Sequence, residues 1–280
     1  MNRRQFLTGL AAAPLFAISA TAVYARFIEP YYYCITEQDV FIRDLPPAFE
    51  NFRITQITDV HHSRIVGLDE LQRVVNLAQS TKPDLIALTG DYTTTYRRYI
   101  EPCAEALGGL NAPEGVWAVL GNHDHYTDRE LTTRALERNH IPVLNNANTR
   151  LRRGSEILQL AGVDDWSWAR TDWDRAFNGI DKNHPTVLLS HQPAVLDLVQ
   201  TQRVSLILSG HTHGGQVTFP IIGAPAKLAT KDLKYAHGLF RRGDTQLYVS
   251  SGTGVIGLPV RLGARPEIAV LRLRRELRTS

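Results

Sequence analysis

The stretch Leu206-Ile-Leu-Ser-Gly-His-Thr-His-Gly-Gly215 is the part of the sequence from which the fold can be predicted. Its apolar and strand-favouring residues predict a buried strand, and its glycines predict a sharp turn where that strand ends. The turn carries His211 and His213, and neutral imidazole nitrogens suit divalent transition metals. The pair alone does not establish a metal site, because histidines spaced in this way also occur as ordinary surface residues.

Four other predicted strands end on residues of the same chemical kind. In α/β sheets, ligands bind in the crevice outside the carboxyl ends of the strands. If the five strands are parallel neighbours, we expect their ends to meet in one such crevice. The side chains that would gather there are two aspartates, one asparagine and five histidines: Asp59, His61, Asp91, Asn122, His123, His191, His211 and His213.

The rest of the chain predicts one mixed α/β domain covering about residues 37–275. Helical spacing of apolar residues is found over 68–80, 99–110, 128–139 and 194–201, and predicted strands lie between these helices. From Gly214 onward the pattern predicts strands and turns alone, beginning with a strand over 217–219.

In this order, the motifs resemble the calcineurin-like metallophosphoesterase superfamily: Asp59-x-His61, Gly90-Asp91, Gly121-Asn-His-Asp124, His191 and Gly210-His-x-His213. The resemblance implies a four-layer α-β-β-α sandwich of two mixed sheets, and a centre of two divalent ions such as Mn, Zn or Fe. One ion would be held by Asp59, His61 and His213. The other would be held by Asn122, His191 and His211. Asp91 would bridge both ions.

The same resemblance implies a phosphoesterase that hydrolyses phosphodiester or pyrophosphate bonds, with a hydroxide between the two ions as nucleophile. His123 would stabilise charge or protonate the leaving group. His62 and His125 adjoin the motifs and are weaker candidates for the pocket. Two alternatives are a non-catalytic metal-binding scaffold protein of the cell envelope and a phosphomonoesterase of the same fold.

Within the superfamily, the chain resembles a bacterial branch that is often exported by the twin-arginine route. This branch includes phosphodiesterases and a UDP-2,3-diacylglucosamine pyrophosphatase of the lipid A pathway. The supporting stretches are 209–216, 248–254 and 257–261. Asp124, where Ser/Thr phosphoprotein phosphatases carry Glu, argues against that activity. The branch implies a phosphate-ester or lipid-diphosphate substrate and leaves its identity open.

The first 25 residues predict a twin-arginine signal peptide or an N-terminal anchor. Arg3 and Arg4 precede an apolar run without acidic residues over 9–25, which is short for a membrane-spanning helix. We therefore expect the export machinery of that route as a partner. The predicted location is periplasmic, extracytoplasmic or membrane-associated, and contact with a membrane surface is consistent with it.

Charge and composition exclude other function classes. The formal net charge of +3 falls to +1 when residues 1–25 are removed, because they hold two arginines and no acidic residue. There is no continuous basic stripe, so nucleic acid is not expected as a partner, and we expect a monomer. Cys34 and Cys103 provide no zinc-type spacing.

The roles of three tryptophans and two arginines stay open on the sequence. Trp166, Trp168 and Trp173 could stack on a substrate or pack over the edge of a sheet. Arg261 and Arg265 could meet a phosphate or pair with the loops around them.

Overall fold

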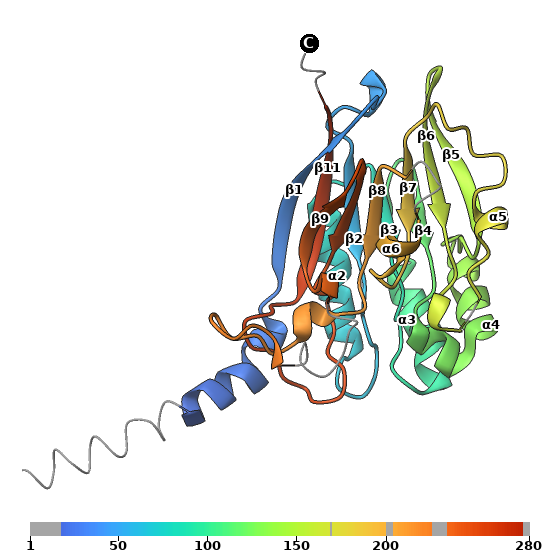
Figure 1. The fold of residues 1–280 in the computed structure, drawn as a ribbon. Coiled ribbons are helices and arrows are strands. Elements are labelled where there is room, and N and C mark those ends of the chain that lie inside the picture. Colours follow the sequence, from blue (N-terminus) through green and yellow to red (C-terminus); the bar gives the residue numbers. More distant parts are fainter. Residues whose placement is uncertain (1–17, 169, 200–203, 226–233, 277–280) are drawn as a thin grey trace, which may run out of the picture.

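The computed structural model describes residues 18–168, 170–199, 204–225 and 234–276. Residues 1–17, which hold the two arginines of the predicted export signal, lie outside the described residues. Two mixed sheets stand face to face (Figure 1). The first has the order β1-β11-β2-β3-β4, with β1 at Cys34–Ile42, β2 at Arg53–Ile57, β3 at Leu85–Leu88, β4 at Val116–Ala118 and β11 at Glu267–Arg275.

The second sheet has the order β5-β6-β7-β8-β10-β9. Its strands are β5 at Ala147–Arg153, β6 at Glu156–Gly162, β7 at Thr186–Leu189, β8 at Leu206–Ser209, β9 at Gly238–Arg242 and β10 at Thr245–Val249. β6, β7, β8 and β10 run parallel, while β5 and β9 lie antiparallel at the two edges.

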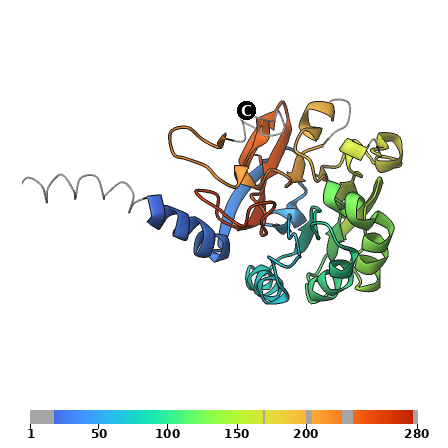
Figure 2. The ribbon, with the colours of Figure 1, turned by 90° about the horizontal axis from the view of Figure 1, so that it is seen from below.

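Helices cover the outer faces of both sheets (Figure 2). The first sheet is covered by α2 at Leu68–Ser80, α3 at Ile100–Leu107 and α4 at Asn122–Arg138; the second is covered by α5 at Trp173–Ala176 and α6 at Val195–Leu198. Short 3-10 helices occur at Glu29–Tyr31, Pro47–Phe49, Arg97–Tyr99, Trp166–Trp168 and His213–Gly215.

Three buried apolar clusters lie between these layers. One joins the α2–α4 helices to the first sheet, one fills the space between the sheets, and one joins α5 and α6 to the second sheet. Buried side chains recur along α2 at Leu71, Val74, Val75 and Ala78, which is the spacing that predicted this helix. The predicted fold class, a four-layer sandwich of two mixed sheets, is confirmed.

The five strands that carry the motifs are not one set of parallel neighbours. β2, β3 and β4 are parallel neighbours in the first sheet, whereas β7 and β8 pair in the second. Their ends meet because the two sheets pack face to face with these strand ends on the same side. The side chain of Gln56 joins the sheets there, since its Nε2 donates to the carbonyl oxygen of Ser209 at 2.9 Å.

One element prediction is incomplete and one is wrong. α4 begins at Asn122, and a backbone kink at Asp128 (φ −176°, ψ 96°) divides it into two parts. The helix predicted from residue 128 is the second part, and the Asp128 side chain caps it by accepting the backbone N–H of Leu131 at 2.9 Å; the first part, 122–127, was not predicted. Residues 217–219 form isolated bridges instead of a strand, pairing Val217 with Leu262 and Phe219 with Gly223.

Residues 18–27 are helical and project from the body of the molecule (Figures 1 and 2). The inner end of this helix is fixed, because the backbone N–H of Arg261 donates to the carbonyl oxygen of Ala25 at 2.9 Å. Among the residues that the structure describes, no helix combines the length and apolar character needed to cross a membrane.

Candidate metal centre

The first ligand cluster joins the end of β2 to the loop after β8. It consists of Asp59, His61 and His213, whose side chains are all buried. The Nε2 atoms of the two histidines lie 3.1 Å apart, and Nε2 of His213 lies 3.4 Å from Oδ1 of Asp59. Three donor atoms, one from each side chain, therefore converge on one point.

The second cluster consists of Asp91, His191 and His211. Nε2 of His191 lies 3.2 Å from Oδ2 of Asp91 and 3.3 Å from Nδ1 of His211. The same Asp91 oxygen lies 3.6 Å from Nε2 of His61 in the first cluster. Asp91 thus contacts both clusters, as a carboxylate shared between two ions would.

Asn122 begins α4 beside the second cluster. Its Oδ1 atom is buried and has no hydrogen-bond partner among the described residues. A buried amide oxygen without a partner is costly unless a further group satisfies it. Together with the nitrogen and carboxylate donors of the two clusters, this oxygen fits a pair of divalent ions such as Mn, Fe or Zn.

Five of the seven predicted ligands adopt a left-handed backbone conformation. The φ angles are 52° for Asp59 and His61, 57° for Asp91, 72° for His211 and 51° for His213. This region is unfavourable for residues other than glycine, and such residues concentrate at functional sites. The strained turns at three strand ends direct the ligand side chains back towards one another instead of along the strands.

Burial and charge set the protonation of the ligands. Burial lowers the pKa of His61 to about 3 and that of His213 well below its ordinary value, so both imidazoles are neutral and able to bind a cation. Burial raises the pKa of Asp59 to about 6. Burial also lowers the pKa of His191, but the Asp91 carboxylate outweighs it and raises that pKa to about 10.

Backbone carbonyl groups fix which ring nitrogen is available on two of the histidines. Nδ1 of His191 donates to the carbonyl oxygen of Thr89 at 2.8 Å, which leaves Nε2 to face Asp91. Nδ1 of His123 donates to the carbonyl oxygen of Thr94 at 2.7 Å. The ring of His123 stands edge-on to that of His61, with centroids 5.0 Å apart. His123 therefore lies against the first cluster while keeping its own Nε2 atom available.

Asp124 is a residue of the site whose role the sequence did not reveal. Its carboxylate accepts the backbone N–H groups of Asp91 at 2.8 Å, Tyr92 at 2.9 Å and Gly121 at 2.9 Å. It therefore ties the loop after β3 to the start of α4, and so places Asp91 relative to Asn122. A carboxylate at the third position of a helix is a capping signal that could have been read from the sequence.

Several other candidates have structural roles. His62 is buried against Tyr99, and its Nδ1 donates to the carbonyl oxygen of Val66 at 2.8 Å. Trp173 packs on Phe177 against the third apolar cluster. Arg261 is fully buried and donates to backbone carbonyl groups of residues 251–264.

Arg265 also serves the surrounding loops. Its guanidinium group lies 3.7 Å from the centre of the Tyr32 ring and donates to the carbonyl oxygens of Tyr32 and Tyr33. Of the open sequence candidates, only Trp166 and Trp168 lie next to the ligands, in a cleft of about 510 Å³ that also contains Asn122 and His211.

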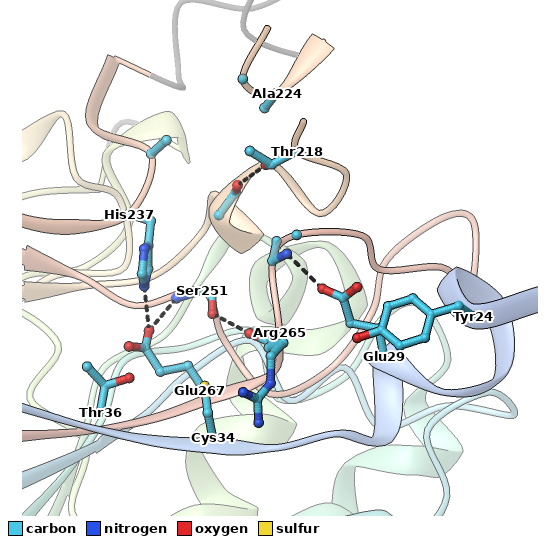
Figure 3. Close-up of a pocket in the computed structure, with 15 residues that line it drawn as sticks. Tyr24, Glu29, Cys34, Thr36, Thr218, Ala224, His237, Ser251, Arg265 and Glu267 are labelled. Atoms are coloured by element: carbon cyan, nitrogen blue, oxygen red, sulfur yellow. Dashed lines mark hydrogen bonds and ion pairs between the residues drawn. The ribbon is translucent and has the colours of Figure 1, made fainter. Parts of the chain in front are cut away.

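A second cavity, of about 520 Å³, lies next to the loop that carries His213 (Figure 3). Gly214 is one of its lining residues, and none of the seven predicted ligands is among them. Its most buried charge is Glu267, which accepts hydrogen bonds from Tyr248 Oη at 2.7 Å and from the backbone N–H of Ser251 at 2.9 Å. Nε2 of His237 lies 3.1 Å from the same carboxylate.

Comparison with known proteins agrees with this geometry. The sequence matches the family described as calcineurin-like phosphoesterase over residues 52–215. It is 34% identical to the uncharacterized metallophosphoesterase YkuE of Bacillus subtilis, over 98% of each chain. It is 30% identical to the phosphodiesterase YaeI of Escherichia coli, over 98% of this chain and 99% of that one.

A solved structure supports the fold alone. The protein TT1561 of Thermus thermophilus is similar with a TM-score of 0.51 at 17% identity, covering 72% of this chain and 89% of that chain. The family match, the relatives and the two ligand clusters lead to one conclusion. The chain belongs to the calcineurin-like metallophosphoesterase family and is a metal-dependent phosphoric ester hydrolase with places for two divalent ions.

Proposed function

We propose that this protein hydrolyses phosphodiester or pyrophosphate bonds at the centre built around Asp91. The observation that carries the proposal is the pair of ligand clusters in contact with one carboxylate, with His123 beside them. When bound, two divalent ions lower the pKa of a water molecule and polarise a phosphoryl oxygen. The chain's own residues would hold the two ions around the Asp91 carboxylate, and His123 would face the same substrate.

His123 is the residue that we assign to the leaving group. Its backbone N–H donates to Oδ1 of Asp91 at 2.9 Å, so its position is coupled to the shared carboxylate. Because Nδ1 is engaged with Thr94, Nε2 is the ring atom left to meet the substrate. From there it would donate a hydrogen bond to a charged phosphoryl oxygen, or a proton to the departing oxygen.

Two observations favour diester or diphosphate hydrolysis over the alternatives. The similar protein of Escherichia coli is named a phosphodiesterase, which supports that activity over a phosphomonoesterase. A non-catalytic envelope scaffold would not need a complete set of ligands, whereas this sequence has a suitable residue at all seven predicted ligand positions and also has His123.

We also propose that the twin-arginine signal exports the protein and that it acts on the outer side of the membrane. The support comes from residues 18–27, whose helix exposes Ile18 and Val23, with Phe27 at its end. The inner end of this helix is held by the backbone N–H of Arg261, which donates to the carbonyl oxygen of Ala25. The same loop contacts the metal centre, because the backbone N–H of Gly254 donates to the carbonyl oxygen of Asp59 at 2.7 Å. A helix at a bilayer would therefore hold the metal side of the protein near lipid, which favours a lipid-linked diphosphate resembling UDP-2,3-diacylglucosamine as substrate.

Hydrolysis of bis-p-nitrophenyl phosphate with added Mn²⁺ tests the catalytic proposal. We expect activity from the wild-type protein and a loss of at least about 100-fold in Asp91→Asn, which removes one of the shared negative charges. p-Nitrophenyl phosphate serves as the monoester comparison. Equal inactivity of wild type and Asp91→Asn with Mn²⁺, Zn²⁺ and Fe²⁺ would refute the proposal, and faster monoester hydrolysis would favour the phosphomonoesterase.

Cell fractionation tests export separately. Replacing Arg3 and Arg4 with lysine should retain the protein inside the cell, because the paired arginines are the part of the signal that the route reads. Unchanged export of the double variant would contradict the twin-arginine assignment. Preference of the purified enzyme for a soluble mononucleotide over a lipid-linked diphosphate would contradict the lipid substrate.

A further inference from the structure

Exposed aromatic rings line the cleft beside the second ligand cluster. The cleft contains the ligands Asn122 and His211, and around them lie Tyr126, Trp166 and Trp168. These three residues are 64%, 44% and 45% exposed. Large aromatic side chains normally lose most of their surface to packing, so three open rings next to a reaction centre indicate a binding surface.

Trp168 is held rigidly from one side. Its ring stacks on that of His125, with centroids 5.7 Å apart and an interplanar angle of 19°. The His125 ring is buried, and its Nε2 lies 2.6 Å from Oδ1 of Asp164. Arg129 donates to the other Asp164 oxygen at 3.0 and 3.2 Å. These contacts to the buried Asp164 carboxylate fix the imidazole under the indole, while Trp168 itself stays 45% exposed.

The loop that carries both tryptophans is also tied to the metal centre. The buried carboxylate of Asp165 accepts the backbone N–H of Ser167 at 2.9 Å and Nε2 of Gln192 at 3.2 Å. Gln192 directly follows the ligand His191 in the chain. The aromatic rings therefore have a set position relative to the ligands, and such preorganisation reduces the entropy that binding would cost.

Resting on the function proposed above, we propose that this cleft binds a planar aromatic group, such as a nucleobase, joined to the phosphate at the metal centre. Indole faces stack on any planar ring, whatever its substituents. The side chains of Ser167 and Gln192 add polar atoms to the lining, which suits a ring with nitrogen and oxygen substituents better than an alkyl chain. The enzyme would then favour phosphodiesters and diphosphates that carry such a ring.

Binding measurements test the cleft independently of turnover. Uridine monophosphate should bind the full-length Mn²⁺-loaded protein more tightly than ribose 5-phosphate, which has the same phosphate but no base. Trp168→Ala and Trp166→Ala should each weaken uridine monophosphate binding by about 5- to 100-fold, and leave ribose 5-phosphate within about twofold. Trp168→Phe should retain most of the affinity, because it keeps a planar ring.

Phe41→Ala is the matched control, since Phe41 is a 50% exposed aromatic residue on β1 and does not line this cleft. It should bind both ligands as the wild type does. Equal losses in Trp168→Ala and Trp168→Phe would overturn the proposal, as would equal affinity of the wild-type protein for the two ligands.

Kinetics separate this inference from the proposed function. The kcat/KM of Trp168→Ala should fall for UDP-N-acetylglucosamine, which carries a base, and stay near the wild-type value for glycerophosphoethanolamine, which carries none. Equal losses on both substrates would show that the enzyme does not recognise the base. That result would overturn the cleft proposal but leave the proposed phosphoesterase activity unaffected. Tryptophan-dependent nucleotide binding without hydrolysis of any ester would support the cleft and contradict the proposed catalysis.

Discussion

Adding a single methyl group at Gly210 should disrupt ion binding at the first ligand cluster and leave binding at the second intact. A Cβ atom at this position would lie 2.1 Å from Oδ2 of Asp59 and 2.2 Å from Oγ1 of Thr58. Ordinary contacts begin at 3.4 Å, so the carboxylate oxygen would have to move by about 1.3 Å. Since φ at Gly210 lies outside the left-handed region, Gly210→Ala acts through this contact and not through backbone strain.

The displacement is large compared with what a metal site tolerates. Ligand distances vary by only about 0.2 Å, so a shift of about 1.3 Å removes Asp59 as a ligand. We expect Gly210→Ala to bind the ion of the first cluster about 100-fold or more weakly, and to lose about 1–3 kcal/mol of unfolding free energy through overpacking. Activity should fall by at least about 100-fold, because misplacement by about 1 Å has that effect.

Metal content by mass spectrometry and Mn²⁺ titration calorimetry would measure the effect. Wild type should hold two ions per chain and Gly210→Ala one. In Gly121→Ala the new Cβ would lie 2.2 Å from Oδ1 of the shared Asp91, so that variant should lose both. Gly109→Ala is the control, because its nearest contact, at 3.3 Å, requires a shift of only about 0.1 Å and it lies away from the ligands. A folded Gly210→Ala protein with two tightly bound ions would refute this reasoning.

Three further outcomes follow from the described contacts. Arg261→Met should lower the unfolding free energy by about 3 kcal/mol or more in urea melts, because several buried carbonyl groups lose their donor; a loss below about 1 kcal/mol would contradict this. Burial raises the pKa of Glu267, but its hydrogen bonds with His237, Tyr248 and Ser251 outweigh this and lower it to about 2, below the ordinary 4.5. The ionised carboxylate therefore contributes about 3 kcal/mol of unfolding free energy above pH 4.5, and this contribution is lost as the pH falls towards 2. Urea melts of Glu267→Gln should show a flatter dependence of stability on pH in that range. An unchanged profile would show that this carboxylate is not the cause of the acid destabilisation. Finally, Mn²⁺ at about 100 times its Kd should raise the melting temperature over that in EDTA by about 5–10 °C, and this increment should be much smaller in Asp91→Asn.

The sequence predicted the chemistry of the centre because that chemistry is local. Each ligand follows a buried strand by two to four residues, and a strand end is a place where a polar side chain can leave the core. The spacing along α2 likewise predicted its bounds, since the buried stripe of a helix repeats every three to four residues. Where local signals overlapped, prediction failed: Asn122 to Thr127 contain motif residues and also form the first part of α4.

Tertiary structure decided how the pieces combine. Pairing of β2, β3 and β4 in one sheet and of β7 and β8 in the other depends on contacts between residues far apart in the chain, and the sandwich brings both sets of strand ends together. The role of each large side chain was decided in the same way. Trp173 and Trp168 come from one tryptophan-rich stretch but have different surroundings. Trp173 packs on Phe177 against the third apolar cluster, whereas Trp168 lies over the His125 imidazole, which Asp164 holds, and stays 45% exposed.

The two histidines at 211 and 213 show both contributions. The sequence by itself determined that two imidazoles follow a buried strand on a glycine-rich turn. The family resemblance implied that they serve different ions, and the tertiary structure decided which side chains each one meets, His213 with Asp59 and His211 with Asp91. The physical reason is that both adopt left-handed backbone conformations in one tight turn, at φ 51° and 72°, so that His213 meets the ligands that follow β2 while His211 meets those that follow β3 and β7.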